Sequence, residues 1–364
     1  MAQVRVDLGD RSYPIIIESG LIERLGTLVR GVLPRVDRAL VISDTNVAPR
    51  YGAQAVAALE AAGISTRLAV VAAGEASKSL QEAYRLYPAC VEAGLERSSV
   101  IVALGGGVVG DLAGFVAATY LRGISFVQVP TTLLAQVDSS IGGKTGVDLP
   151  QGKNLVGAFH QPRLVVSDLN TLTTLPHREI AAGMAEVVKH AVIRRADFLD
   201  YLESNVREIQ AVQPAVVGRV VESNCLIKAQ VVAADEREGG IRAILNFGHT
   251  VGHAVEAATG FTQWLHGECV AVGMVAATAI AREAGILRDP RLPQRLESLL
   301  QQLGLPVRLP EGLAMESLAP LMQRDKKVEA GRIRWVLPVR AGEVALTPEV
   351  PPEAVARALN SLRG

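Results

Sequence analysis

The sequence has no net charge, because 37 basic residues are balanced by 37 acidic ones over 364 residues. A chain without an excess of positive charge lacks the long-range field that attracts nucleic acid or an anionic membrane. Any anionic partner must therefore be bound by a local cluster of basic side chains. This balance favours a protein that binds small molecules.

Cysteine is also scarce: the chain has only Cys90, Cys225 and Cys269, which show no CxxC spacing and cannot all pair with one another. This usage indicates a reducing compartment. The first residues lack the basic segment followed by an apolar one that marks a secretory signal. The longest apolar run, residues 269–281, is shorter than the ~20 residues that cross a bilayer. We therefore expect a cytoplasmic protein.

The opening third of the chain alternates short β-branched runs with helical patterns and contains no repeats or low-complexity segments. This alternation predicts a parallel sheet with helices on both faces, whose ligands bind at the carboxyl ends of the strands. The predicted strands are 4–8 and 13–17, which form a hairpin, then 39–43, 66–72 and 99–104, and the predicted helices are 47–62 and 79–93.

A glycine-rich turn follows the apolar strand at 99–104 and places Gly105, Gly107 and Gly110 at GxGxxG spacing. Such glycines let the backbone approach a pyrophosphate at the start of a helix. The usual acid about 20 residues further on, which holds the ribose, is missing. Asp44 ends an earlier strand instead, so we expect a nucleotide in a variant arrangement. The alternative is that the glycines serve only tight turns and close packing.

Residues 119–154 are rich in groups that bind anions. The glycines and turn formers of residues 139–154 are typical of a binding loop rather than a helix. The triplet at 143–145 lacks the earlier glycine of a P-loop, which argues against a nucleoside triphosphate site. The basic and polar candidates in this stretch are Arg122, Thr131, Thr132, Lys144, Lys153 and Asn154, with Asp138 among them.

After residue 170 the pattern becomes mainly helical, so we predict two domains, 1–170 and 171–364. Glu186 and Lys189 can share a helix face. The predicted helices are 176–194, 214–234, 248–258, 267–284 and 292–303, followed by strands near 333–337 and 344–346 and a closing helix from residue 352.

Half of the six histidines fall in one short segment, as His249, His253 and His266. His249 and His253 are one helical turn apart and share a face. Imidazoles at this spacing with a more distant third ligand suit a tetrahedral metal, and a catalytic site keeps one position open. The pattern alone leaves open which of the three bind the metal.

Taken together, these motifs closely resemble the 3-dehydroquinate synthase family of sugar phosphate cyclases over essentially the whole chain. The segments that carry the resemblance are GGGVVGDLAGFVAATYLRGI, VPTTLLAQVDSSIGGKTGVDLPQGKNLVGAFHQP, GMAEVVKH, RAILNFGHTVGHA, HGE and RDKK. The resemblance implies a Rossmann-like NAD-binding domain followed by a mainly helical metal-binding domain. It also implies that Glu186, His249 and His266 hold zinc or cobalt, which leaves His253 for the substrate.

The same resemblance implies a set of cofactor and substrate contacts. Lys228 and Arg242 would hold a substrate carboxylate, and Asp138, Glu186 and Lys189 would meet hydroxyls or proton-shuttling waters. Lys144, Asn154, Asn246, His253 and Lys326 would gather at the phosphate, with Arg122 from the other subunit of a homodimer. The implied NAD contacts are Asp44, Gly74, Glu75, Lys78, Gly106, Gly107, Val108, Val109, Gly110, Asp111, Thr131, Thr132, Lys144, Lys153, Thr171, Leu172, Thr173, Thr174 and Leu175.

The activity that the resemblance implies is conversion of 3-deoxy-D-arabino-heptulosonate 7-phosphate to 3-dehydroquinate and phosphate, in the shikimate pathway. The steps would be transient oxidation by NAD, phosphate elimination, re-reduction, ring opening and aldol closure. Related cyclases act on sugars without a carboxylate, whereas Lys228 and Arg242 are both present here. The alternative function is a metal-dependent polyol dehydrogenase of similar architecture.

Overall fold

The computed structural model describes residues 1–261, 263–313, 315–323, 328–329 and 332–363. The chain forms two compact units, the first made of Met1–Leu175 and Val217–Arg237, the second of Pro176–Val216 and Glu238–Gly364. The segments 1–170 and 171–364 do not coincide with these units, because most of one long helix, α8 (Pro214–Ala234), joins the first unit. The functional division at residue 170 stays a prediction.

The first unit is built on a seven-stranded sheet with the order β1-β2-β9-β6-β5-β3-β4. All neighbouring strands are parallel except β1 and β2, which form the predicted N-terminal hairpin. The strands are β1 (Ala2–Val6), β2 (Tyr13–Glu18), β3 (Arg38–Asp44), β4 (Ser65–Val71), β5 (Val100–Gly105), β6 (Ser125–Pro130) and β9 (Leu164–Asp168).

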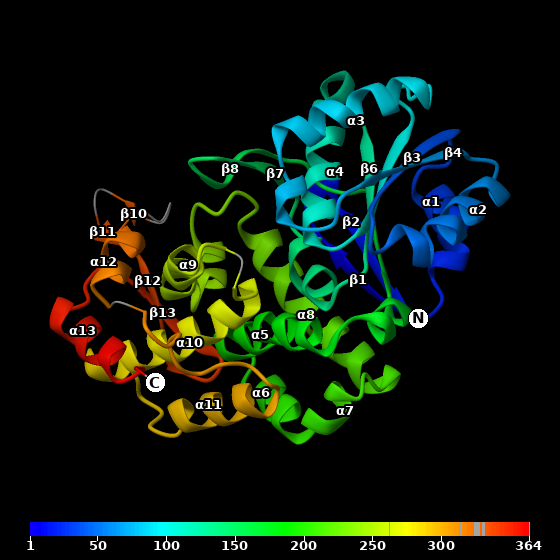
Figure 1. Cartoon of the computed structure of the whole chain (residues 1–364). Coiled ribbons are helices and arrows are strands. Elements are labelled where there is room, and N and C mark those ends of the chain that lie inside the picture. The colour runs from blue at the N-terminus through cyan, green and yellow to red at the C-terminus, as the bar shows by residue number, and fades with distance from the viewer. Residues whose placement is uncertain (262, 314, 324–327, 330–331, 364) are drawn as a thin grey trace. The chain divides into compact units, whose positions relative to one another are not determined.

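Helices cover both faces of this sheet, as the sequence predicts: α1 and α2 lie on one side and α3 and α4 on the other (Figure 1). The apolar strand β5 faces both layers, since Val102 joins the α1–α2 core while Ile101 joins the α3–α4 core. The helices are α1 (Leu25–Val32), α2 (Ala53–Ala61), α3 (Leu80–Glu92) and α4 (Gly107–Thr119).

Two sequence predictions in this unit need correction. The helix predicted at 47–62 begins with a π-helical turn, Ala48–Gly52, before α2. The stretch predicted as an irregular binding loop is mostly an antiparallel hairpin of β7 (Lys144–Leu149) and β8 (Gly152–Phe159). Glycine in this hairpin allows the two strands to approach closely, because a Cβ at Gly157 would lie 2.2 Å from the carbonyl oxygen of Thr145.

The second unit is mainly helical. The longest apolar helix, α10, is buried along most of its length, and α9 and α5 both pack against it. Its helices are α5 (His177–Arg194), α6 (Ala196–Ser204), α7 (Val206–Gln210), α9 (His249–Ala258), α10 (His266–Glu283), α11 (Leu292–Gln302), α12 (Met315–Gln323) and α13 (Pro352–Asn360), and its strands are β10 (Val328–Glu329), β11 (Arg332–Ile333), β12 (Trp335–Arg340) and β13 (Glu343–Thr347).

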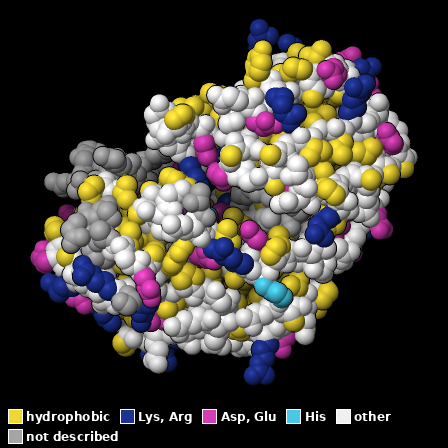
Figure 2. All heavy atoms as spheres, viewed as in Figure 1, with side chains coloured by type: hydrophobic (Ala, Val, Ile, Leu, Met, Phe, Trp, Pro, Cys, Tyr) yellow, Lys and Arg dark blue, Asp and Glu magenta, His cyan; other side chains and the backbone are white. Residues whose placement is uncertain are grey.

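Figure 2 shows acidic and basic side chains interspersed on the visible face, in agreement with the balanced composition. No helix within the described ranges combines the length and hydropathy that a bilayer-spanning segment requires.

Candidate active site

The carboxyl ends of the parallel strands bring the predicted cofactor residues of the first unit to one edge of the sheet. Asp44 ends β3, Gly105 ends β5, and Thr131 follows β6. From β3 the chain continues to β4 on one side, and from β5 it continues to β6 on the opposite side. The strand order therefore reverses between the neighbouring strands β3 and β5. Such a point of reversal is where ligands bind in open α/β sheets.

The glycine turn at this edge packs tightly against neighbouring side chains. A Cβ at Gly106 would lie 3.1 Å from Thr132 Cγ2, and one at Gly107 would lie 3.0 Å from Ser139 Oγ. Close to it, the hydroxyl of Thr131 is buried and makes no hydrogen bond to any described residue. The glycine contacts with protein side chains agree with the alternative that the glycines serve close packing, whereas an unsatisfied hydroxyl beside a helix N-terminus fits a bound phosphate group of a dinucleotide.

A charged cluster lies beside this turn. Lys78 Nζ is 2.6 Å from Asp111 Oδ2 and 3.9 Å from Glu75 Oε1, and Lys153 Nζ is 3.7 Å from the same Glu75 oxygen. Burial raises the pKa of Asp111 and of Glu75, against the opposing effect of Lys78. Burial alone would lower the pKa of Lys78, but Asp111 and Glu75 raise it. The structure thus groups residues that the family resemblance assigns to the NAD site.

Other predicted cofactor residues form hydrogen bonds within the protein. Asp44 Oδ1 accepts hydrogen bonds from the backbone N–H groups of Asn46 and Val47, at 2.8 and 3.0 Å. Thr171 Oγ1 donates to Asp168 O at 2.7 Å in the short helix Leu169–Thr174. Val109, Gly110, Thr171 and Leu172 are buried, whereas Gly74, Thr173 and Thr174 are exposed.

Two predicted substrate residues of the first unit meet. The ammonium group of Lys228, on α8, donates to the carboxylate and the carbonyl oxygen of Asp138. Lys228 is only 6% exposed. The Asp138 carboxylate thus compensates the charge of this buried ammonium group. The other predicted substrate residues of this unit are Lys144, which is exposed on β7, Asn154, which lies on β8, and Arg122. Asn154 and Arg122 both have positive backbone φ angles, 54° and 67°.

In the second unit, glycines let three helices approach closely. A Cβ at Gly273 of α10 would lie 1.9 Å from the carbonyl oxygen of Gly248, just before α9, and one at Gly267 would lie 2.0 Å from Ala182 O on α5. Gly248 itself has φ of 80°, which side chains disfavour. This packing places the first residues of α9 and α10, His249 and His266, beside α5.

Glu186 of α5 stands opposite both histidines. Its Oε1 lies 3.7 Å from His249 Nε2 and 3.7 Å from His266 Nε2. Ligand atoms about 2.1 Å from a tetrahedral metal are separated by about 3.4 Å, so this donor set fits zinc or cobalt with a small contraction. The other oxygen, Oε2, contacts the ammonium group of Lys189. The structure brings together the three predicted metal ligands and Lys189.

The two histidines are oriented through their opposite ring nitrogens. His249 Nδ1 is 3.1 Å from Phe247 O, and His266 Nδ1 is 3.1 Å from Glu256 Oε2. Burial disfavours a charged ring, but the carboxylates of Glu186 and Glu256 outweigh burial and raise the pKa of His266 to about 9. A metal ion binding at neutral pH therefore has to displace a proton from this site.

His253 lies on the next turn of α9, with its ring centroid 5.2 Å from that of His249 and 5.9 Å from that of His266. His253, Glu256 and His266 form a second group whose ligand atoms could meet at one ion. Sequence reasoning missed Glu256. It follows His249 and His253 in an i, i+4, i+7 series that marks one helix face, which was the available signal.

The remaining predicted residues of the second unit are Arg242, Asn246 and Lys326. Arg242 is 2% exposed, an unusual burial for a guanidinium group. Asn246 Nδ2 donates to Glu238 Oε1 at 2.9 Å. Lys326 and its neighbour Lys327 lie outside the described residues.

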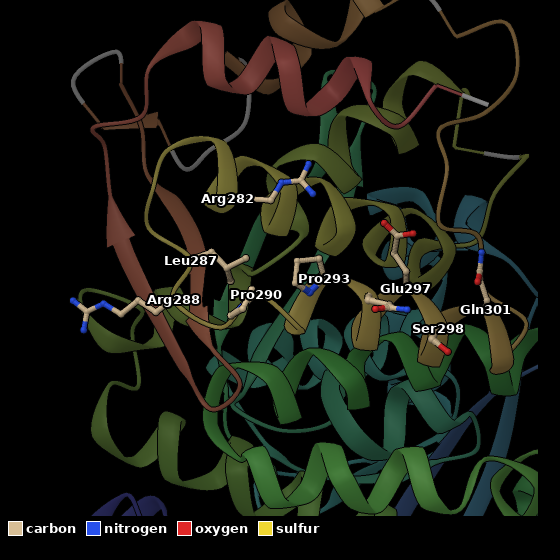
Figure 3. Close-up of a pocket in the computed structure, with 9 residues that line it drawn as sticks. Arg282, Leu287, Arg288, Pro290, Pro293, Glu297, Ser298 and Gln301 are labelled. Atoms are coloured by element: carbon tan, nitrogen blue, oxygen red, sulfur yellow. The ribbon is translucent and has the colours of Figure 1, made fainter.

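A surface pocket of the second unit lies between the end of α10 and α11 (Figure 3). None of the predicted catalytic, metal, cofactor or substrate residues lines it. The lining residues are Arg282, Leu287, Arg288, Pro290, Pro293, Gln294, Glu297, Ser298 and Gln301. The candidate active site is therefore not this pocket.

Comparison with known proteins gives a consistent result along the chain. Residues 68–182 match the family described as 3-dehydroquinate synthase N-terminal, and residues 183–328 match 3-dehydroquinate synthase C-terminal. A 3-dehydroquinate synthase of Symbiobacterium thermophilum is 64% identical, over 98% of this chain and all of that protein. One from Gloeobacter violaceus is 51% identical over 100% of both chains.

Solved structures of related cyclases share the fold. A 2-deoxy-scyllo-inosose synthase complexed with carbaglucose-6-phosphate, NAD+ and Co2+ has a TM-score of 0.90 at 26% identity, covering 99% of this chain and 100% of that one. The 2-epi-5-epi-valiolone synthase of Streptomyces hygroscopicus, with NAD+ and Zn2+ bound, has a TM-score of 0.87 at 26% identity and covers 98% of each chain. Fold, donor sets and full-length identity agree, and the chain belongs to the 3-dehydroquinate synthase family.

Proposed function

We propose that the chain catalyses the 3-dehydroquinate synthase reaction, a carbon–oxygen lyase reaction that converts 3-deoxy-D-arabino-heptulosonate 7-phosphate to 3-dehydroquinate and phosphate. The observation that carries the proposal is Glu186 Oε1 facing the Nε2 atoms of both His249 and His266, in a chain whose curated relatives bear that name. NAD and a zinc or cobalt ion are the proposed cofactors.

When bound, NAD supplies a hydride acceptor that is regenerated in each turnover, and the metal supplies Lewis acidity at a substrate hydroxyl. Glu186, His249 and His266 would hold the ion. The turn from Gly106 to Asp111 at the start of α4 and the hydroxyl of Thr131 would hold the dinucleotide. The 3.7 Å distances from Glu186 Oε1 to both imidazole nitrogens support the metal assignment, and the unsatisfied Thr131 hydroxyl supports the NAD assignment.

The chain's own groups would bind the substrate and move its protons. Buried Arg242 and Lys228 are assigned to the substrate carboxylate, because each presents a positive charge with little competing water. The Asp138 carboxylate, held by Lys228, and the Lys189 ammonium group, held by Glu186, can exchange protons with substrate hydroxyls. The phosphate is assigned to Arg122, Lys144, Asn154, Asn246, His253 and Lys326.

Substrate discrimination tests this proposal. Phosphate release is measured for the heptulosonate phosphate and for sedoheptulose 7-phosphate, which lacks the carboxylate. The natural chain should release phosphate rapidly only from the sugar acid. Arg242→Met should lose about 2 kcal/mol of transition-state stabilisation with the acid, roughly a thirtyfold fall in kcat/KM, because a charged hydrogen bond is removed.

Arg288→Met is the control, because Arg288 lies in the surface pocket away from the donor sets and should leave kcat/KM unchanged. Equal phosphate release from both sugars by the natural chain would contradict the assignment of a carboxylate-bearing substrate. A homodimer that supplies Arg122 across its interface is part of the same proposal, and light scattering of the purified chain can check the dimer. Location in the cytoplasm is a further part of the proposal.

A further inference from the structure

Glu256 is a buried carboxylate that touches a proposed metal ligand. Its side chain is 7% exposed, and its Oε2 lies 3.1 Å from Nδ1 of His266. It extends from the third turn of α9, whereas His266 is the first residue of α10. The contact therefore joins two helices at the position where the second one supplies a ligand.

The two nitrogens of the His266 ring face two different carboxylates. Nδ1 faces Glu256, and Nε2 lies 3.7 Å from Glu186 Oε1. A neutral imidazole carries one N–H, which donates, and one lone pair, which accepts or binds a metal. When a metal ion replaces the proton on Nε2, the remaining N–H on Nδ1 can donate to Glu256, and the lone pair on Nε2 is directed toward the proposed metal position beside Glu186.

His249 provides an internal comparison. Its Nδ1 is also occupied, but by the main-chain carbonyl of Phe247 at 3.1 Å, and its Nε2 also lies 3.7 Å from Glu186 Oε1. Both rings thus present the same nitrogen to the same oxygen. They differ in that a neutral carbonyl orients His249, whereas a charged acceptor orients His266.

We propose that Glu256 is a positioning residue that fixes the tautomer and the orientation of His266, so that Nε2 binds the metal, and that increases the electron density of this ligand. The proposal rests on the metal site of the proposed function and adds to it a residue outside the ligand set. A carboxylate behind a metal-bound histidine typically contributes about 10- to 100-fold in metal affinity.

The alternative is that Glu256 is itself a ligand, together with His253 and His266. Occupation of both groups at once would require His266 to bind one ion through each nitrogen and to lose both ring protons. An imidazole gives up its second proton only with great difficulty, so one ion with Glu256 behind it is the simpler arrangement.

Zinc affinity of the full-length chain, measured by competition with a chromophoric chelator, tests the proposal. Glu256→Ala should bind zinc about 10- to 100-fold more weakly, and Glu256→Gln should fall between it and the natural chain, because an amide oxygen still accepts the Nδ1–H but carries no charge. In the zinc-loaded natural chain, 15N NMR of labelled histidine should show Nδ1 protonated and Nε2 metal-bound for His266. The visible spectrum of the cobalt-loaded Gln variant should shift.

Glu283→Gln is the matched control, because this α10 carboxylate pairs with Arg357 at 2.9 Å rather than with a histidine. Its zinc affinity and cobalt spectrum should match those of the natural chain. If Glu256→Ala does not fold, the zinc affinity of the isosteric Glu256→Gln variant tests the proposal by itself.

Unchanged zinc affinity in the Gln and Ala variants would overturn the proposal. Two zinc ions per chain, or metal on Nδ1 of His266, would overturn it in favour of Glu256 as a ligand. These measurements need no turnover, so they can fail while phosphate release from the heptulosonate phosphate succeeds, and the reverse also holds.

Discussion

The ammonium group of Lys189 contacts Oε2 of Glu186 one turn earlier on the same helix, and the two side chains are only 2% and 0% exposed. A buried carboxylate is costly unless cations and hydrogen bonds compensate its charge. Lys189 supplies compensation from the protein, and a bound metal ion would add to it at Oε1. The stability of α5 and metal binding should therefore be linked.

Lys189→Met should expose this linkage. Without zinc, the variant should lose about 3 kcal/mol of unfolding free energy, because the buried carboxylate loses a cationic partner. With zinc bound, the loss should be smaller, since the ion compensates the same charge. Thermal unfolding with and without zinc measures both values. Arg340→Met removes an exposed i,i+3 partner of Glu343 and should change stability by less than about 0.5 kcal/mol. Equal destabilisation of Lys189→Met in both states would contradict the linkage.

His249→Ala and His253→Ala should separate the roles of neighbouring helix turns. The first variant removes an Nε2 that faces Glu186 and should lose metal affinity by orders of magnitude. The second should retain the metal and lose phosphate binding or elimination. Metal content after dialysis against a chelator gives the answer, and an equal loss from both variants would show that His253 is also a ligand.

Gly273→Ala should push α9 and α10 apart, because its Cβ would lie 1.9 Å from Gly248 O. We expect destabilisation of at least about 2 kcal/mol and weaker zinc binding, since His249 and His266 begin these helices. Gly31→Ala is the control: its Cβ meets nothing within 4 Å, and alanine should stabilise α1 slightly. Denaturant unfolding measures both variants. Natural-like stability of Gly273→Ala would contradict the close helix packing.

The cysteines should be inert in the folded chain. Burial raises the pKa of Cys90 and of Cys225 to about 12, so the reactive thiolate is roughly one part in ten thousand at pH 8. Cys269 is also buried. A disulfide reagent should label none of these buried thiols at pH 8 until denaturant is added. The thiolate fraction of Cys90 and Cys225 should grow about tenfold with each pH unit up to about pH 12. Rapid labelling of Cys90 or Cys225 at pH 8 would contradict this burial.

Much of the fold could be predicted because local signals and packing agree. The helix predicted at 214–234 is α8 with the same bounds, and the strand at 99–104 is β5 displaced by one residue. The hairpin of β7 and β8 was missed because its glycines indicated turns, whereas their function is to let two backbones approach closely.

The structure brings the three proposed metal ligands together, whereas the carboxylate of Glu256 beside them was not predicted. The pairing of Glu186 with His249 and His266 came from a family resemblance, because spacing alone cannot bring α5 to the starts of α9 and α10. Glu256 was missed because its role depends on a contact with the next helix, although it shares a face with His249. Sequence periodicity identifies which residues share a helix face, but not which other helix that face contacts.

The redox balance of turnover tests the central claim most directly, because oxidation and re-reduction within one cycle leave no net change in cofactor. The zinc-loaded chain is incubated with limiting NAD and excess 3-deoxy-D-arabino-heptulosonate 7-phosphate, and inorganic phosphate and NADH absorbance are followed together. The account predicts many equivalents of phosphate per NAD with no matching rise in NADH. One NADH for each substrate oxidised, with the reaction stopping when NAD is exhausted and no phosphate released, would contradict it and indicate a polyol dehydrogenase.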